Sequence, residues 1–331
     1  MTRRFKALVV RSSQNKDYTR AIEDRDLTDL PKGDVLIRVH FSSLNYKDGL
    51  SCLGNRGVTR HYPHTPGIDA AGIVETSDSD AFTPGEEVIV ISHDLGMNTS
   101  GGFAQYIRVP SDWVMHLPEG MSLRESMIYG TAGFTAALAL EALQHHGVTP
   151  NHGPIAVTGA SGGVGSISIA LFASQGYSVS ASTGKSNTAT FLTDLGACQV
   201  VDRQAVNIAS SMNLLKEVWA GAVDTVGDNT LATLLKTCKQ GGAIAATGLV
   251  ESSNLNTSLL PFILRGVQLL GINAQGAPVT VRKAIWSKLA TKWKPTSLER
   301  LAVDLDLSEL DAAIDRIIAG KQRGRVVIHI P

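Results

Sequence analysis

The sequence predicts an α/β protein that joins a doubly wound parallel sheet to a β-rich domain. Three observations lead to this fold class. A glycine-rich turn at 159–165 connects an apolar run to a helical stretch, five strand-like runs follow it, and the first third of the chain holds short strand-like runs between turn signals. Strands that alternate with helices are typical of a doubly wound sheet, and short strands between turns are typical of a β-rich domain.

The glycine-rich turn lies in the stretch Val157–Gly165, which reads VTGASGGVG. A strand, a glycine turn and a helix start predict a dinucleotide site, because glycines let the backbone approach a pyrophosphate and the helix start offers free N–H groups. The glycine spacing differs from the common G-x-G-x-x-G pattern, so the βα units that follow supply the supporting context. We expect cofactor contacts from Ser161, Gly162, Gly163 and Val164.

The second strand-like run, Tyr177–Ser182, ends in the turn Ser182-Thr183-Gly184-Lys185. NAD-binding folds usually place an acid here to bind the ribose 2′-hydroxyl. This turn offers two hydroxyls and a cation instead, which suit a 2′-phosphate, so the sequence favours NADPH over NADH. The alternative for Lys185 is a solvated loop charge. Arg203, after the third run, is a further candidate for the adenine or the 2′-phosphate, with a solvated arginine as its alternative.

Four more strand-like runs complete a six-stranded sheet: Gln199–Asp202, Ala222–Gly227, Gly242–Gly248 and Val267–Gly271. Ligands of doubly wound sheets bind at the carboxyl ends of the strands, near the switch in strand order. We therefore expect Gly248, Leu249 and Asn273 to border the cofactor.

The β-rich part is built from strand-like runs at 6–10, 34–40 and 87–91, with Pro-Gly turn signals between them. The end of the chain contributes a helical stretch at 307–318 and a strand-like run at 324–330. These runs predict a first domain at 1–125 that is completed by 274–331, and a cofactor domain at 126–273. We expect the active site in the cleft between the two domains.

Composition favours a soluble enzyme. The chain has 331 residues, 43% of them hydrophobic, and a formal net charge of +0, which gives no sign of a nucleic-acid or membrane partner. The longest apolar stretch, Ala136–Leu140, is too short to span a bilayer. The basic start lacks the apolar region of a signal peptide. Three scattered cysteines, Cys52, Cys198 and Cys238, are typical of a reduced cytoplasmic protein.

Five segments resemble the medium-chain dehydrogenases/reductases, in which a GroES-like catalytic domain surrounds a Rossmann domain. The resemblance covers essentially the whole chain and points to the zinc-free branch of acrylyl-CoA reductases and quinone oxidoreductases. It implies a homodimer that pairs through sheet edges, which would explain the apolar run Val267–Ile272. The segments that carry it are Ser42–Asp48, Pro66–Gly72, Gly130–Ala136, Trp219–Gly227 and Pro261–Arg265.

The same resemblance raises the question of zinc. Zinc alcohol dehydrogenases place a His-Glu pair after the glycine of the second segment, where this chain has Ile68-Asp69, and an isoleucine cannot bind a metal. A four-cysteine structural site is impossible with three cysteines. Two histidine pairs remain, His61 with His64 and His145 with His146, and neither has ligand-like surroundings in the sequence. We expect an enzyme without a metal.

Without zinc, oxidation of an alcohol is difficult, and reduction of a conjugated double bond is favoured. Hydride from NADPH would reach the β-carbon of a short 2-enoyl-CoA, and acryloyl-CoA would give propanoyl-CoA. The α-carbon then takes a proton, while the enolate-like oxygen needs hydrogen-bond donors. One alternative is an NADPH quinone or enone reductase of the same fold. Another is an NADPH-binding protein without turnover.

Four further residues are candidates for this chemistry or for contacts with the cofactor. Tyr46 is the candidate proton donor and Asn45 the residue that positions it or contacts the nicotinamide ribose. The alternatives are that Tyr46 only packs against the nicotinamide and that Asn45 caps a helix. Thr131 is expected near the nicotinamide, with an ordinary N-cap as its alternative. Arg325 is expected to reach the cofactor or a CoA phosphate.

Overall fold

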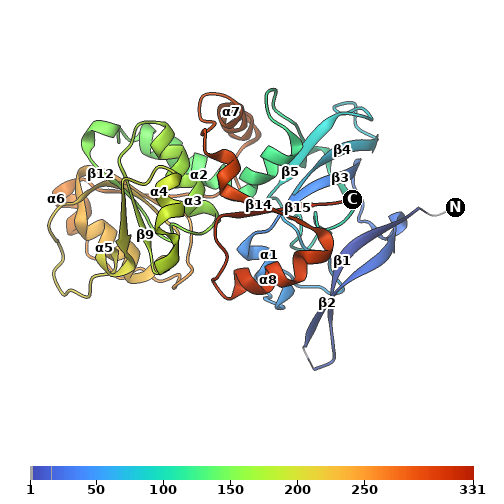
Figure 1. Cartoon of the computed structure of the whole chain (residues 1–331), viewed down its shortest axis with the longest axis horizontal. Coiled ribbons are helices and arrows are strands. Elements are labelled where there is room, and N and C mark those ends of the chain that lie inside the picture. Colours follow the sequence, from blue (N-terminus) through green and yellow to red (C-terminus); the bar gives the residue numbers. More distant parts are fainter. Residues whose placement is uncertain (1–2, 16) are drawn as a thin grey trace. The chain divides into compact units, whose positions relative to one another are not determined.

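The computed structural model describes residues 3–15 and 17–331, and the chain divides into two compact units. Unit 1 runs to Thr131 and resumes at Ala302, and unit 2 spans Ala132–Leu301. Figure 1 shows strand-rich unit 1 mostly in blue, cyan and red, and unit 2 mostly in green, yellow and orange. The predicted α/β class, with a β-rich part and a parallel-sheet part, is confirmed.

Unit 2 is built on a six-stranded sheet in which every pairing is parallel. The strand order is β10-β9-β8-β11-β12-β13, so the order reverses between β8 and β11, where a doubly wound sheet binds its ligand. The strands are β8 (Ile155–Val157), β9 (Val179–Thr183), β10 (Gln199–Asp202), β11 (Trp219–Asp224), β12 (Cys238–Ala246) and β13 (Gln268–Gly271).

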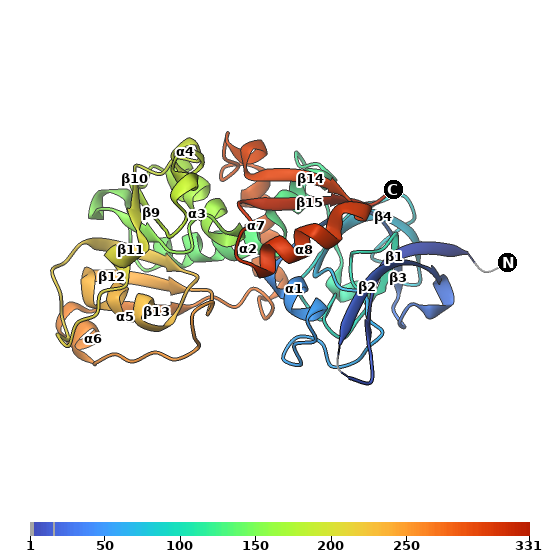
Figure 2. The same ribbon diagram turned by 60° about the horizontal axis from the view of Figure 1, so that its bottom comes forward.

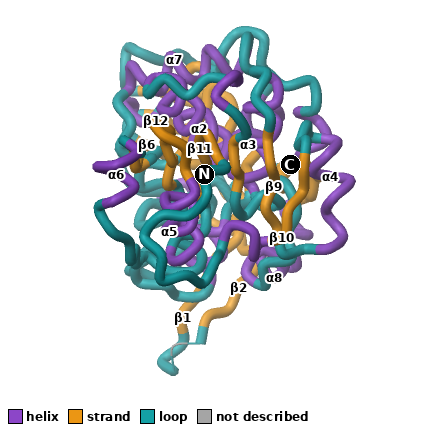
Figure 3. Tube along the Cα trace, turned by 90° about the vertical axis from the view of Figure 1, so that its left-hand side faces the viewer, coloured by secondary structure: helices purple, strands orange, loops and turns teal. Residues whose placement is uncertain are grey.

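Helices flank this sheet, as the tube in Figure 3 shows. Helix α3 packs against β8 and β9, and α5 packs against β11 and β12. The residues of the central strands β8 and β11 are all buried and mostly apolar, as expected for a parallel sheet covered by helices. The helices of this unit are the second half of α2 (Leu123–His145), α3 (Gly163–Ser174), α4 (Ala189–Asp194), α5 (Asp228–Thr237), α6 (Leu260–Arg265) and α7 (Val279–Ala290).

Helix α7 differs from the sequence prediction, which assigned 274–331 to the first domain. The structure places residues 274–301 in unit 2. The reason is packing against the second half of α2: the Trp286 ring stacks on Phe134 at 6.4 Å, and Lys288 forms an ion pair with Glu141. The chain therefore returns to unit 1 at Ala302 rather than near Asn273.

Unit 1 contains a two-stranded sheet and a seven-stranded sheet. The larger sheet has the order β14-β15-β3-β4-β5-β7, with β6 paired to β3, and Figure 2 shows α8 lying beside β14 and β15. Helices α1 and α8 pack together. The elements are β1 (Arg4–Ser12), β2 (Tyr18–Asp26), β3 (Val35–Ser43), α1 (Tyr46–Cys52), β4 (Asp69–Ser77), β5 (Glu87–Ile91), β6 (Tyr106–Val109), β7 (Met115–His116), β14 (Ala302–Asp306), α8 (Leu310–Ile318) and β15 (Arg325–His329).

Helix α2 connects the two units and bends at Gly130, whose φ of 49° and ψ of −155° are not helical. Within the described residues it is the one helix long and apolar enough to cross a membrane, and 78% of that window is buried inside the protein. Such burial is typical of a core helix. The bend places Thr131 at the start of a second helical segment, and this start lies in the candidate site of unit 1.

Candidate functional site

The glycine-rich loop of unit 2 follows β8 and leads into α3. Gly162 is the N-cap of this helix, and its N–H donates to Gly159 O at 2.9 Å, which folds the loop tightly. A Cβ at Gly165 would lie 2.4 Å from Gly159 O, so only glycine allows this close approach. The first N–H groups of the 12-residue helix have no partners within the helix. The loop that holds Ser161, Gly162 and Gly163 therefore fits a pyrophosphate.

The predicted 2′-phosphate residues lie together at the carboxyl end of β9. The Lys185 N–H donates to Thr183 Oγ1 at 3.1 Å. A Cβ on Gly184 would lie 3.1 Å from Cδ and 3.3 Å from Nε of Arg203, so the arginine side chain lies against this turn. Burial lowers the pKa of Lys185. Arg203 thus lies against the turn that ends in Lys185. Contacts of either side chain with a phosphate stay predictions.

A polar pair at the switch point escaped the sequence analysis. Thr158 follows β8 and donates from Oγ1 to Asp224 Oδ1 at 2.6 Å, at the end of β11. The Thr225 N–H donates to Thr158 Oγ1 at 3.0 Å, and Gly227 N–H donates to Asp224 Oδ2 at 2.8 Å. Burial raises the pKa of Asp224. These bonds tie together the two strand ends where the cofactor is expected.

The remaining predicted cofactor residues of unit 2 follow β12 and β13. Gly248 lies in close contact with the Thr225 carbonyl, because a Cβ on Gly248 would lie 2.4 Å from that oxygen. Leu249 is 65% exposed. Asn273 is exposed, and its Oδ1 accepts from Gly276 N–H at 3.1 Å. Their contacts with the cofactor stay predictions.

Asp69 is the centre of a buried polar network in unit 1 that no sequence pattern indicates. The residue has no exposed surface. Its carboxylate accepts from Ser43 Oγ at 2.6 Å, from Asn45 Nδ2 at 2.7 Å and from Thr131 Oγ1 at 2.6 Å. The Thr131 N–H also donates to it at 3.0 Å. Asp69 therefore caps the second segment of α2 and fixes the corner that precedes α1.

Asn45 is the N-cap residue of α1 and forms a capping box with Asp48. Its Nδ2 donates to Asp69 and to Ser43 O, and its Oδ1 accepts from Arg325 Nη1 at 3.3 Å. The amide donors are thus engaged inside the unit, which favours the positioning role over direct contact with the cofactor. Asp48 provides the reciprocal cap, because its Oδ2 accepts from the Asn45 N–H at 2.8 Å.

Tyr46 lies at the first position of α1, directly after this fixed corner. It is 45% exposed, whereas Asn45 is buried. Its phenol is not part of the Asp69 network, so it is accessible to a ligand of unit 1. The placement is compatible with the proton-donor hypothesis and equally with a packing role.

Thr131 lies at the start of the second helical segment of α2, and Asp69, not the Thr131 side chain, accepts its backbone N–H. Its Oγ1 donates to Asp69 and lies 3.0 Å from Ser92 Oγ. Ser92 has a φ of 60°, and the next residue, His93, has a φ of 53°. Consecutive left-handed residues other than glycine are strained and often occur at functional sites. A contact between Thr131 and the nicotinamide stays a prediction.

Arg325 does not face solvent, although the sequence analysis placed it near the cofactor or a CoA phosphate. Its side chain is 2% exposed. The guanidinium donates to Ile128 O at 3.0 Å, to Leu44 O at 3.0 Å and to Ser43 Oγ at 2.7 Å. Burial lowers its pKa, and the charges of Asp69 and Asp48 oppose that shift. The geometry gives Arg325 an interior structural role and offers no support for direct phosphate contact.

The positions that correspond to zinc ligands hold other groups. Ile68 is buried, and its N–H donates to Asp48 Oδ1 at 2.9 Å. His64 is buried as well, with Nε2 2.9 Å from Gly96 O. In the part of the chain that the structure describes, no three His, Cys, Asp or Glu side chains gather as a metal site would require.

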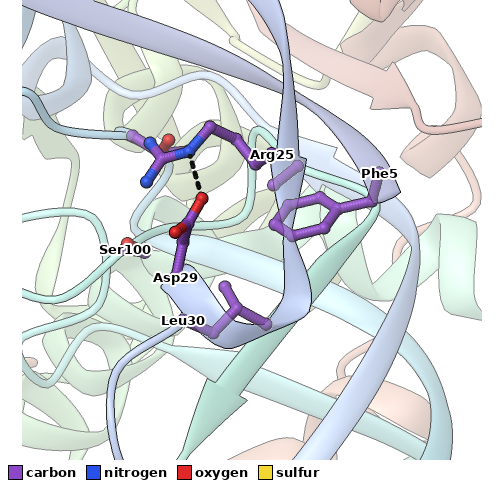
Figure 4. A pocket seen from close by; sticks show the side chains of 7 residues that line it. Phe5, Arg25, Asp29, Leu30 and Ser100 are labelled. Atoms are coloured by element: carbon purple, nitrogen blue, oxygen red, sulfur yellow. Dashed lines mark hydrogen bonds and ion pairs between the residues drawn. The ribbon is translucent and has the colours of Figure 1, made fainter. Parts of the chain in front are cut away.

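A separate small hollow in unit 1 is lined by Phe5, Arg25, Asp29, Leu30, Thr65, Ser100 and Ala104 (Figure 4). Arg25 and Asp29 form an ion pair across it at 3.1 Å. It contains none of the candidate catalytic residues, and its charges neutralise each other.

Comparison with known proteins supports this assignment of the two units. The alcohol dehydrogenase GroES-like domain matches residues 31–119, and the zinc-binding dehydrogenase family matches residues 163–290. Acrylyl-CoA reductase AcuI of Ruegeria pomeroyi is 44% identical over 98% of this chain and 99% of its own.

Two further relatives have solved structures. Putative quinone oxidoreductase YhfP of Bacillus subtilis is 40% identical over 100% of both chains. Its crystal structure with NAD bound has a TM-score of 0.96 and covers 99% of this chain and 100% of that one. The yhdH oxidoreductase of Salmonella enterica, in complex with NADP, is 40% identical with a TM-score of 0.95, covering 98% of this chain and 100% of that one. The chain therefore belongs to the medium-chain dehydrogenase/reductase superfamily, in the branch of acrylyl-CoA reductases and quinone oxidoreductases.

Proposed function

We propose that this protein is an NADPH-dependent oxidoreductase that reduces the conjugated C=C bond of a short 2-enoyl-CoA, with acryloyl-CoA as substrate and propanoyl-CoA as product. The observation that carries the proposal is the accessible Tyr46 phenol beside a corner that Asn45 and Asp69 hold in place. The 44% identity to an acrylyl-CoA reductase over nearly the whole chain supports the choice of substrate.

The residues of unit 1 would act on the thioester end of the substrate. Bound NADPH supplies the hydride that reaches the β-carbon. Negative charge then develops on the thioester oxygen and the α-carbon, and the Tyr46 hydroxyl donates a hydrogen bond to that oxygen or a proton to that carbon. Asn45 and Asp69 keep the start of α1 fixed, so the backbone position from which the Tyr46 side chain extends is fixed as well.

The cofactor residues of unit 2 favour NADPH. Lys185 and Arg203 place two cations at the end of β9, where an NAD-dependent enzyme would place an acid. The Salmonella relative was solved with NADP and the Bacillus relative with NAD, so both cofactors occur among close relatives. Independence from zinc is part of the proposal. The buried Ile68 supports it, and activity should survive a strong chelator, with elemental analysis finding no stoichiometric zinc.

Reduction of quinones or enones is the second candidate, because YhfP carries a quinone oxidoreductase name at 40% identity. A panel that compares acryloyl-CoA, crotonoyl-CoA and a simple quinone with NADPH decides between them. The proposal requires the highest kcat/KM for acryloyl-CoA. A quinone that exceeds both thioesters would favour the second candidate, and turnover of none would favour a non-catalytic NADPH-binding protein.

A cytoplasmic homodimer completes the proposal. Strand β13 pairs only with β12 on one side, and its other edge is open within the described chain. Helix α6, which packs against β12, and the residue before it expose three large apolar side chains, Leu259, Ile263 and Leu264, at 62–72% of their surface. Such exposed apolar surface is typical of a contact with a second chain. The free cysteines, two of them buried, suit a reducing compartment. Sedimentation velocity would test the dimer.

A further inference from the structure

The segment that contains Tyr46 carries positive charge that the proposed reaction does not use. Between residues 47 and 68 the cations Lys47, Arg56 and Arg60 are accompanied by a single acid, Asp48, which is fully buried. Arg56 and Arg60 are exposed, and Lys47 is half-buried. We call these three cations the basic segment.

Several other arginines of unit 1 form ion pairs with acids of the same unit. Arg3 pairs with Glu75, Arg11 with Glu23, and Arg20 with Asp311 and Asp315. Among the described residues, neither Arg56 nor Arg60 forms an ion pair. Their charge is therefore available to an anion from outside the chain, and a guanidinium binds phosphate oxygens in a fork-like geometry.

The loop that carries Arg56 is held rigidly. Asn55 accepts the Gly57 N–H on its side-chain oxygen at 2.9 Å, and its carbonyl accepts from Val58 and Thr59 at 2.9 and 3.0 Å. Thr59 Oγ1 lies 2.7 Å from Ser51 Oγ of α1. The turn is thus fixed to the same short helix that begins with Tyr46, and a preorganised loop loses less entropy on binding.

Lys47 and Arg60 flank one neighbouring turn. Lys47 Nζ lies 4.0 Å from Met97 Sδ, and the Arg60 N–H donates to Asn98 Oδ1 at 3.3 Å. The acid of that turn, Asp94, accepts from Asn98 Nδ2 at 3.0 Å and from Thr99 Oγ1 at 3.1 Å. It stabilises the turn and forms no ion pair with Arg60.

We propose that the basic segment is the anchor for the phosphates of coenzyme A, that is, for an adenosine 3′,5′-bisphosphate moiety at the far end of the substrate. This inference rests on the proposed function, since only a CoA thioester brings such phosphates. The pantetheine arm separates these phosphates from the thioester. The basic segment would therefore bind the phosphates while Tyr46 contacts the acyl thioester. The anchor would select CoA thioesters over uncharged enones and quinones.

Direct binding tests the anchor without relying on turnover. Adenosine 3′,5′-bisphosphate is titrated calorimetrically into the protein saturated with NADPH, which blocks the cofactor site. We expect the Arg56→Glu/Arg60→Glu variant to bind about tenfold or more weakly, because two charge-assisted contacts become repulsive, and binding to the wild type should weaken as salt rises. Arg4→Glu is the matched control, because Arg4 of β1 is exposed and forms no ion pair within residues 3–15 and 17–331, and it should bind like the wild type. No binding to the wild type, or equal loss in both variants, would overturn the anchor.

Kinetics separate this inference from the proposed function. The wild type should show a much lower KM for acryloyl-CoA than for acryloyl-N-acetylcysteamine, which lacks the phosphates, and the double variant should lose that difference with kcat unchanged. A double variant that keeps the difference would overturn the anchor while leaving the proposed reaction intact. Reduction of neither thioester would overturn the reaction, and the titration would still decide whether the segment binds the bisphosphate. An unchanged Kd for NADPH confirms that the variants are folded.

Discussion

The Asp69 carboxylate lies 3.9 Å from the Arg325 guanidinium, and both groups are almost completely shielded from solvent, at 0% and 2% exposure. Hydroxyl, amide and backbone donors complete the surroundings of the pair. Ser43 contacts both members, since its Oγ donates to Asp69 and accepts from Arg325. The pair thus holds together β3, β4, β15 and the bend of α2, which are distant in sequence.

Removing the charge of Asp69 should destabilise the protein strongly. Asp69→Asn keeps the side-chain size but leaves the buried Arg325 uncompensated and places amide hydrogens against the donors of Asn45 and Thr131. Loss of one partner of a buried pair costs about 3–5 kcal/mol. Urea unfolding measures this, with Arg11→Ala as the control, because its exposed pair with Glu23 should be worth less than about 1 kcal/mol. Equal losses in the two variants would contradict the structural role of the pair.

Gly130 should tolerate no side chain. Its positive φ favours glycine, and a Cβ would lie 2.4 Å from Asp69 Oδ2 and 2.6 Å from Ser43 Oγ. Gly147 provides the comparison, because it also has a positive φ of 78° but nothing within 4 Å of its Cβ position. Gly147→Ala should cost about 1–2 kcal/mol from backbone strain alone, and Gly130→Ala should cost at least about 2 kcal/mol more. Thermal unfolding of both variants checks the difference.

Asp48 should make the protein less stable as the pH rises through neutrality. Burial raises the pKa of Asp48 from 3.8 to about 7, although three backbone N–H groups bind its carboxylate. The folded state therefore holds this proton more tightly than the unfolded chain. The resulting stabilisation is complete below pH 4 and is lost as the pH passes through about 7. Asp48→Asn should flatten the stability profile between pH 5 and 8, and an unchanged slope in this variant would exclude Asp48 as its source.

The elements of unit 2 were predictable because local signals there are strong. The glycine turn at 159–165 lies between a strand-like run and a helical stretch and is followed by further βα units, which together predict a dinucleotide site. The buried runs such as Ile155–Val157 have the length and composition of parallel strands. The same signals could not show whether α7 packs in unit 1 or in unit 2. Apolar residues such as Trp286 indicate that the helix is buried, but not which helix or sheet covers it. The strand β14 was not predicted, because its five residues AVDLD include two aspartates and none is buried, so its structure depends on pairing with β15.

The candidate site of unit 1 was only partly predictable. Asn45 and Tyr46 were found through their motif, but Asp69 gains its role from Ser43, Thr131 and Arg325, which lie far away in the sequence. These contacts form only in the folded chain, so no pattern of neighbouring residues in the sequence indicates them. The same reason explains Arg325: an arginine in a strand near the chain end resembles a surface cation until the buried carboxylate that faces it is known.

The choice of cofactor should depend on Lys185. Lys185→Glu replaces one of the two cations at the end of β9 with a like charge for the 2′-phosphate. Loss of a charge-assisted contact costs about 1.5–3 kcal/mol, so the Kd of NADPH should rise at least tenfold while that of NADH changes little. Fluorescence titration with both cofactors measures this. Equal affinity of the wild type for NADPH and NADH would contradict the assignment of this turn to the 2′-phosphate.

The role of Tyr46 can be separated into its ring and its hydroxyl. Tyr46→Phe keeps the ring and removes the hydroxyl, and Tyr46→Ala removes both. If the hydroxyl donates the proton, Phe should lower kcat by roughly 10²–10⁴-fold with little change in the Kd of NADPH. If the ring only packs against the nicotinamide, Phe should be nearly silent and Ala should raise that Kd. The side chain is 45% exposed, so neither variant should alter the folding of unit 1. Asn45 and Asp69 fix the backbone beside this residue, so helix α1 should not shift to compensate for the lost hydroxyl. Water could supply the α-proton instead, which would limit the Phe effect to less than tenfold. A fully active Phe variant would therefore end the assignment of Tyr46 as the general acid.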